Sequence, residues 1–298
     1  MKKISNEKGW KISANIVMIL FSVLAVAPFL LLLIGSFTDN DWAVAHGFSY
    51  FPKEWSLSAY TYIAGSIATI GKAYGMTILA TAVGTALSIF VTVTFAYTLS
   101  YTELPGIRLL NFLTIFTMLF SGGIVASFYI WVNVFHIRDT FWALIFPNLM
   151  MNAFNVILVK NYYITSVPHS LIEAARIDGA GEFKIFGKIV FPLSGPIIAT
   201  IGLMTGIMYW NDWTNGLYYL TARNGSRFYT IQLVLNQINN SITFLSQNAG
   251  ASLADAASLP TTTARMAIAV VGVLPVILAY PFFQKYFAKG ITMGAVKE

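Results

Sequence analysis

The stretch EAARIDG at residues 173–179, with IVFP at residues 189–192 after it, is a polar, helix-forming insert in a very apolar chain. A membrane-spanning helix needs about 20 consecutive apolar residues, and a run with this many charges does not lie in lipid. The insert is therefore expected between two membrane spans, against a surface in water. Its charged residues are Glu173, Arg176, Asp178, Glu182, Lys184 and Lys188.

The composition is that of a membrane protein. Of the 298 residues, 57% are hydrophobic and 10% are charged, against about 25% charged in soluble domains. The chain has no Cys, which excludes disulfides and thiolate metal sites. Its three histidines lack the spacing of metal ligands, so no metal site is predicted. The net charge of +6 does not indicate a nucleic-acid partner, because the basic residues cluster at the edges of the apolar runs.

Six apolar runs predict an all-α, polytopic membrane protein with six transmembrane helices in a single domain, residues 1–298. Backbone polar groups in hydrocarbon must be paired internally, and these runs are too long and too continuously apolar for a β-barrel. The first run resembles a signal peptide but continues through residues 28–34, so it is interpreted as an uncleaved span. The spans are expected at residues 16–37, 74–97, 109–135, 141–159, 197–217 and 266–283.

The distribution of Lys and Arg predicts the orientation. With the N-terminus inside, twelve of the eighteen basic residues fall on the inner segments and six on the outer ones. Positive charge accumulates on the cytoplasmic side of membrane proteins. Both termini and the insert are therefore expected in the cytoplasm. Two outer connections, residues 38–73 and 218–265, are long, and the second is rich in Asn, Gln, Ser and Thr, which favours either a functional loop or a solvated linker.

Local signals divide the insert into two helices. Pro168 fits the first turn of a helix, and Gly179 fits a left-handed cap at its end. A second helix over residues 182–190 returns the chain to the membrane. Helical spacing puts four residues of the first helix on one face: Leu171, Ala174, Ala175 and Asp178. Without further signals, the insert fits equally well an amphipathic helix lying on anionic lipid or a helix that docks on another protein.

The insert resembles the EAA loop of the membrane subunits of binding-protein-dependent ABC importers. The match is Glu-Ala-Ala, three residues, Gly, nine residues, Ile, one residue, an apolar residue and Pro, with Phe191 where that family usually has Leu. In the family this loop docks into a cleft of a separate ATPase subunit. The resemblance therefore implies a cytoplasmic coupling loop at residues 164–192. The residues expected to couple to the ATPase are Glu173, Ala174, Ala175, Asp178 and Gly179.

The resemblance covers most of the chain and is strongest for the carbohydrate-importing branch of Gram-positive bacteria. The stretches that carry it are FSGG at 120–123, YWNDW at 209–213 and YPFFQKYF at 280–287, with KG at 289–290 and GAVK at 294–297. One departure is Ala126-Ser127, where Pro-Thr is expected.

The family implies a bacterial cell-membrane complex with a division of labour. This subunit would pair with a second homologous permease, two ATPase subunits would bind below, and an extracellular, lipid-anchored binding protein would deliver an oligosaccharide. ATP and Mg would be used by the ATPase subunits, and this chain would bind no cofactor. It has no P-loop of its own, because five residues separate Gly181 from Gly187-Lys188 and Ile189 stands in place of Ser or Thr.

Three groups are candidates for the translocation pathway. Asn148, Asn152 and Asn155 would form one amide stripe on the fourth span, suited to interhelical hydrogen bonds or to a sugar path. Ser121 and Gly122 interrupt the third span, as happens where backbone lines a cavity. The residues Tyr209, Trp210, Asn211, Asp212 and Trp213 combine rings, amides and a carboxylate, and they suit sugar contacts or an interfacial aromatic belt.

The sequence also bears on two other transport classes. An ion-coupled secondary transporter usually carries acidic residues near the membrane midplane, and the predicted spans hold no acidic residue away from their ends. A permease for a non-sugar solute stays open, because the residues do not identify the substrate. An enzyme is not expected, since no nucleophile–base or metal set is visible.

Overall fold

The computed structural model describes residues 2–247 and 261–295, and in these ranges it is helical without strands. An isolated bridge joins Thr38 to Trp55. The chain divides into two compact units, which are described separately. One comprises Met1–Ala68 and Leu235–Pro275, and the other comprises Thr69–Val234 and Val276–Glu298.

The first unit is built on α1 (Lys2–Ser36), α2 (Asn40–His46), α3 (Ser58–Ala64) and parts of α13 (Ile231–Gln247) and α15 (Thr261–Ala295). Asp39 caps α2 by accepting hydrogen bonds from the backbone N–H groups of residues 41 and 42 at 3.0 and 3.2 Å. The end of α1 is fixed by a 2.8 Å hydrogen bond between the hydroxyls of Ser36 and Tyr60.

The stretch Gly9–Ser36 of α1 is long and apolar enough to cross a membrane, and none of its most apolar window is buried inside the protein. Large side chains such as Phe21 and Leu24 are more than half exposed. A surface this apolar does not remain in water, so it agrees with a helix whose neighbours are lipid or other subunits.

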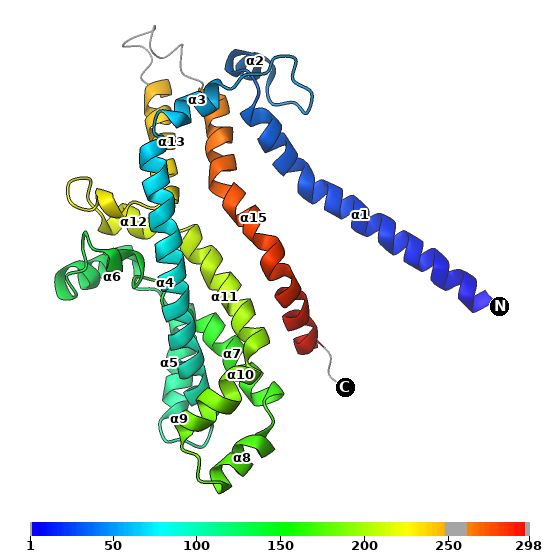
Figure 1. Ribbon diagram of the computed structural model, residues 1–298, viewed down its shortest axis with the longest axis vertical. Helices are drawn as coiled ribbons and strands as arrows, with labels where there is room; N and C mark the ends of the chain where they lie inside the picture. The colour runs from blue at the N-terminus through cyan, green and yellow to red at the C-terminus, as the bar shows by residue number, and fades with distance from the viewer. Residues whose placement is uncertain (1, 248–260, 296–298) are drawn as a thin grey trace. The chain divides into compact units, whose positions relative to one another are not determined.

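The second unit begins with α4 (Ile67–Ser100) and α5 (Ile107–Leu119), which run into shorter helical pieces. These are α6 (Gly123–Tyr129), η1 (Ile130–Val134), η2 (Phe141–Leu144), α7 (Ala153–Ser166), α8 (His169–Ile177), α9 (Glu182–Ile185), η3 (Phe186–Val190), α10 (Phe191–Leu193), α11 (Gly195–Trp210), α12 (Thr214–Tyr219) and η4 (Ser226–Phe228). Helices α8 and α9 lie at the end of the unit where α4 ends, while α6 and α12 lie further back along α4 (Figure 1).

Two apolar clusters form the core of the second unit. One joins the C-terminal half of α4 to α7, α8 and α11 through residues such as Val93, Val156 and Ile201. The other gathers Ile145 and Tyr209 with residues of α4 and α12. At Gly84 a Cβ atom would lie 2.5 Å from the Tyr209 ring. Glycine is therefore required here for α4 and α11 to pack closely.

Helices cover the first, second and sixth predicted spans without a break. Residues 16–36 lie in α1, 74–97 lie in α4, and 266–283 lie in α15. The third span is interrupted after Leu119, as the Ser121-Gly122 segment predicts, and its two halves bend by 119°. Of the described helices, two are long and apolar enough to cross a membrane, or up to four if each bent pair counts as one span. The count of six stays a prediction.

The prediction of an unbroken helix at residues 141–159 is wrong. A 3₁₀ turn covers Phe141–Leu144 and α7 begins at Ala153. Between them, Pro147 has no N–H to continue a helix, and Asn148 adopts a left-handed conformation with φ of 61°. Asn tolerates this conformation better than most residues. The break could not be predicted from the sequence, because the segment is mostly apolar.

The prediction of an unbroken helix at residues 197–217 is also wrong. Helix α11 ends at Trp210 and α12 begins at Thr214. The Asp212 carboxylate accepts hydrogen bonds from the backbone N–H groups of Thr214 and Asn215 at 3.1 and 3.2 Å. Such side-chain caps compete with helix continuation, so the chain restarts as a new helix.

Candidate functional site

The EAARIDG insert forms α8 and the turn that follows it. Asp178 is the last residue at the helix end, and Gly179 has the predicted left-handed conformation, with φ of 75°. The Gly179 N–H donates to the Arg176 carbonyl at 3.0 Å, and the Ala180 N–H donates to the Ala175 carbonyl at 2.9 Å. This pair of hydrogen bonds is a Schellman motif, which turns the chain sharply toward α9.

The structure divides the face predicted for α8. Ile172 is buried and Ala175 packs against the core of the second unit, whereas Ala174 and Asp178 are exposed. Ala175 is therefore only in part available to another protein, because it packs against this buried cluster. Glu173 and Gly179 are also exposed. Pro168 precedes the helix as its N-cap instead of lying in the first turn.

Two large apolar side chains flank the Gly179 turn and lie uncovered. Ile177 is 86% exposed and Phe183 is 95% exposed. Sequence reasoning missed both, although an Ile and a Phe within a charged insert were a usable signal. Uncovered apolar groups ringed by charges are typical of interaction surfaces. The exposed part of the insert thus combines the Glu173 carboxylate, small side chains and two apolar tips.

A polar cluster joins the insert to the end of α4. The Arg176 guanidinium donates to the Glu182 carboxylate through Nε at 3.0 Å and Nη2 at 2.8 Å. The hydroxyls of Tyr97 and Tyr101 lie 2.8 and 3.2 Å from the other carboxylate oxygen. The hydrogen bond to Glu182 raises the pKa of Arg176, and burial raises the pKa of Tyr101.

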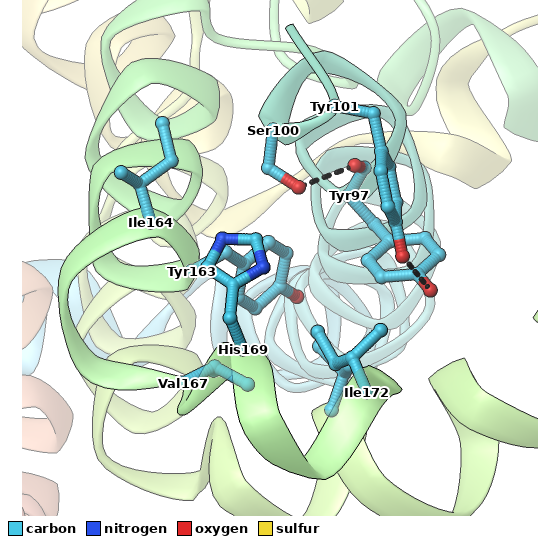
Figure 2. Close-up of a pocket in the computed structure, with 9 residues that line it drawn as sticks. Tyr97, Ser100, Tyr101, Tyr163, Ile164, Val167, His169 and Ile172 are labelled. Carbon is cyan, nitrogen blue, oxygen red and sulfur yellow. Dashed lines mark hydrogen bonds between the residues drawn. The ribbon is translucent and has the colours of Figure 1, made fainter. Parts of the chain in front are cut away.

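A pocket lies behind the tyrosines, between the end of α4, the end of α7 and the start of α8. Figure 2 shows Tyr97 and Tyr101 with their hydroxyls turned toward each other, and His169 and Ile172 coming from α8. The pocket is apolar for the most part and closed on one side by the Tyr163 ring. Several of its lining residues, among them Tyr163 and Ile172, belong to the buried cluster that joins α7 and α8 to α4.

The return path from the insert is bent. A π-helical turn at Phe186–Val190 precedes Pro192, since proline cannot donate the hydrogen bond that a regular helix needs. The segment Glu182–Leu193 then meets Gly195–Trp210 at 78°. The predicted second helix of the insert is confirmed in its position, with this irregular geometry.

The interruption of the third span is an exposed turn. The Ser121 hydroxyl accepts a hydrogen bond from the Gly123 N–H at 3.2 Å, and Gly123 has φ of 74°. Gly122 precedes α6, and a Cβ atom added to it would meet only the Ala126 side chain of that helix, at 3.7 Å. Both Ser121 and Gly122 are exposed, and the turn is open to whatever lies beside it.

The three asparagines of the predicted amide stripe do not share one helix face. Asn148 is exposed in the non-helical segment, and Asn152 caps α7 by accepting from two backbone N–H groups at 2.9 and 3.2 Å. Asn155 is 2% exposed and donates to the Thr205 hydroxyl of α11 at 3.3 Å. The stripe geometry is wrong because the helix starts only at Ala153.

The YWNDW segment separates into buried and exposed parts. Tyr209 is 2% exposed and donates to the Ile145 carbonyl at 2.9 Å. Trp210 packs near Tyr74, with ring centroids 6.3 Å apart. Asn211 and Trp213 are exposed, and Asn211 accepts a hydrogen bond from the Gln232 amide at 3.4 Å. The exposed side chains, not Tyr209, are the ones open to a ligand.

The non-helical fourth segment and the α11–α12 junction lie together. Besides the Tyr209 bond, the Asn215 amide donates to the Pro147 carbonyl at 2.9 Å. Helix α6 reaches the same place, because the Ser127 and Tyr219 hydroxyls are 3.2 Å apart. The breaks of the fourth and fifth predicted spans thus meet around α12, and helix α6 of the third span lies beside them. In the described ranges no group of three or more His, Cys, Asp or Glu is placed to hold a metal ion.

Comparisons with known proteins place these features in one family. A family model described as the binding-protein-dependent transport system inner membrane component matches residues 9–293. The polygalacturonan/rhamnogalacturonan transport system permease protein YtcP of Bacillus subtilis is 40% identical over 280 residues, which are 94% of this chain and 95% of that protein. Protein LplC of the same organism is 38% identical over 274 residues, 92% of this chain and 90% of that protein.

A solved structure has the same fold. It is a bacterial ABC transporter involved in the import of the acidic polysaccharide alginate, and one of its chains matches with a TM-score of 0.75 and 30% sequence identity. The match covers 95% of this chain and 98% of that chain.

Proposed function

Because this chain belongs to the family of binding-protein-dependent transport system inner membrane components, we propose that it forms, with a second related permease, the path by which an oligosaccharide crosses the membrane. It is a permease subunit of a carbohydrate ABC importer, and it acts in transport rather than catalysis. The observation that carries this function is the match along nearly the whole chain to the permease from Bacillus subtilis.

The insert is the coupling loop in this proposal. Helix α8 is amphipathic, and its exposed side offers Glu173 and Ala174 to a partner. Gly179 ends the helix tightly, so that the two apolar tips project together with this surface. An ATPase cleft that covers Ile177 and Phe183 gains the free energy of removing both from water. ATP binding then moves the loop through its different affinity for two states of the complex.

The translocation pathway is proposed around the chain breaks of the second unit. The exposed candidates there are Ser121, Gly122, Asn148, Asn211 and Trp213. Irregular backbone at membrane depth is tolerated where it lines a cavity or is buried in protein, and amides and rings suit sugar hydroxyls and sugar faces. The remaining candidates support the same region through caps, hydrogen bonds and, for Trp210, a ring contact; they are Asn152, Asn155, Tyr209, Trp210 and Asp212.

The same proposal includes the membrane topology of the chain and its partners. The chain crosses the membrane six times, with both termini and the insert in the cytoplasm, and it stands in contact with membrane lipid. Its partners are a second permease, two ATPase subunits that use ATP and Mg, and an extracellular, lipid-anchored binding protein. The polar segment at residues 218–265 faces that binding protein; its residues 248–260 lie outside the described ranges.

The test is co-purification of the full complex followed by ATPase assays with its binding protein. The substrate panel pairs galacturonate and alginate oligosaccharides with neutral malto-oligosaccharides of the same length. We expect ATP hydrolysis to rise severalfold when binding protein and one class of oligosaccharide are both present. A complex whose ATPase activity responds to amino acids or ions and to no carbohydrate would overturn the substrate class.

A further inference from the structure

We propose that Glu182 is a positioning residue that ties the insert to the end of α4 through Tyr97 and Tyr101, so that α4 follows every movement of α8. This inference rests on the proposed function, in which α8 receives movement from an ATPase subunit. It adds a route by which that movement enters the membrane helices, separate from the chain connection through α10 and α11.

The geometry of the cluster carries the inference. Both oxygens of the Glu182 carboxylate are used: Oε1 accepts from Nε and Nη2 of Arg176, at 3.0 and 2.8 Å. Oε2 lies 2.8 Å from the Tyr97 hydroxyl and 3.2 Å from the Tyr101 hydroxyl. The residues come from α8, α9 and the end of α4, and the tyrosines are more than 80 positions away in sequence. One carboxylate therefore joins three elements.

Tyr97 is well anchored in α4. Its ring packs against Phe186 at 5.0 Å and edge-on against Tyr163 at 6.2 Å. Its hydroxyl lies 2.5 Å from that of Tyr101, and the Arg176 guanidinium lies 5.2 Å from the centre of the Tyr101 ring. Aromatic contacts of this kind fix ring positions. A carboxylate bonded to these hydroxyls is consequently held to a rigid part of the unit.

The tyrosine hydroxyls, not the ion pair, form the link to α4. The Arg176 and Glu182 side chains are 45% and 54% exposed, and exposed ion pairs contribute little on their own. That pair also lies within the insert and connects only α8 to α9. Hydrogen bonds to a charged carboxylate are stronger than neutral ones, and here they reach α4 beside the apolar cluster that Leu99, Ile172 and Ile185 share.

Apolar packing also joins the insert to this end of the unit, because Ile172 and Ile185 belong to the same buried cluster as Leu99 of α4. One hollow is lined by Tyr97, Tyr101 and Ile172 among others, and a second, more open one by Tyr97, Tyr101, Leu104, Arg176 and Glu182. Figure 2 shows the first of these hollows beside the paired hydroxyls. Beside these hollows, the hydrogen bonds from the two hydroxyls to Glu182 add a polar connection between the insert and the end of α4.

The test uses the whole complex in proteoliposomes and measures oligosaccharide transported per ATP hydrolysed. The double variant Tyr97→Phe/Tyr101→Phe keeps both rings and removes both hydroxyls. We expect its transport-to-ATP ratio to fall about tenfold, the loss typical of one hydrogen bond to a charged group. Glu182→Gln should lower the transport-to-ATP ratio by a similar factor. Adding Glu182→Gln to the double variant should lower the ratio little further, because the same hydrogen bonds are already lost.

The matched control is Glu103→Gln, which removes an exposed carboxylate near the same end of α4. Its ratio should equal that of the unaltered complex. If the double Phe variant assembles normally and keeps an unchanged ratio, or if its loss and that of Glu182→Gln simply add, the inference is wrong. An unaltered complex without ATP-driven uptake would instead overturn the proposed function.

If the double Phe variant assembles poorly, a covalent crosslink in place of the hydrogen bonds provides a second test. The chain has no Cys, so Tyr101→Cys/Glu182→Cys introduces the only thiols of this subunit. We expect a low transport-to-ATP ratio before treatment and recovery of at least half the normal ratio after bridging with a short bismaleimide. A bridge that forms completely and restores nothing would contradict the inference.

Discussion

At the scale of single residues, conformation and hydrogen bonding decide which positions tolerate change. Gly179 is a clear case, because its φ of 75° is required by the Schellman turn. Nothing lies within 4 Å of the place where its Cβ would be. The constraint is thus in the backbone and not in space.

Gly179→Leu should therefore uncouple transport from ATP hydrolysis while the subunit still inserts into the membrane. A side chain in the left-handed region costs about 1–2 kcal/mol, which is enough to shift the turn and the tips it carries. Uptake per ATP is the measurement. Gly181→Leu is the control, since Gly181 has φ of −70° and free space around it. Equal ratios in the two variants would rule out this role for the turn.

Asn155 could act in helix packing or in the sugar path, and its burial favours helix packing. Asn155→Leu should lower the thermal stability of the complex by about 0.6–2 kcal/mol, the range for interhelical hydrogen bonds in membranes. The KM for oligosaccharide should not change. Thr205→Val removes the same 3.3 Å bond from the other side and should match it. A KM raised severalfold with stability intact would assign Asn155 to the path.

At the scale of elements, α8 and the start of α9 act as one exposed surface. Its apolar tips are the strongest anchors that this surface offers a partner, since fully burying an Ile or Phe is worth about 1.5–3 kcal/mol. Ile177 and Phe183 are both more than four-fifths exposed. A partner that covers them accounts for their exposure.

Ile177→Ser/Phe183→Ser should weaken association with the ATPase subunits by more than about tenfold. Binding of detergent-purified ATPase to the immobilised permease pair measures this. Phe51→Ser, at an 88% exposed position of the first unit, should leave the affinity unchanged. Wild-type affinity in the double variant would mean that the ATPase does not cover these tips.

Local signals in the sequence predicted some elements well and others poorly. The left-handed Gly179 and the break at Ser121-Gly122 are set by residues next to one another, so they were visible. The breaks at Asn148 and Asp212 could not be predicted from the sequence. An apolar run has the same composition whether or not its backbone carbonyls accept hydrogen bonds from distant residues. The Tyr97–Glu182 contact joins residues 85 positions apart, and no local sequence pattern predicts it.

For the whole molecule, the proposed function requires that the insert face the cytoplasm and that the α12–η4 region face outward. The absence of Cys makes this testable with single thiols. Arg223→Cys should react with a membrane-impermeant maleimide on intact cells, while Lys184→Cys should react only after permeabilisation. Both positions are exposed, so reactivity reports the side of the membrane. Labelling of Lys184→Cys on intact cells would invert the topology.

The central claim is that this subunit conducts an oligosaccharide under the control of an ATPase. Its most direct measurement is the uptake of labelled oligosaccharide into proteoliposomes that hold both permeases and the ATPase subunits. We expect uptake only when ATP is on the ATPase side and loaded binding protein is on the other, and none with a non-hydrolysable ATP analogue. Uptake that proceeds without ATP, driven by a proton or sodium gradient, would contradict it.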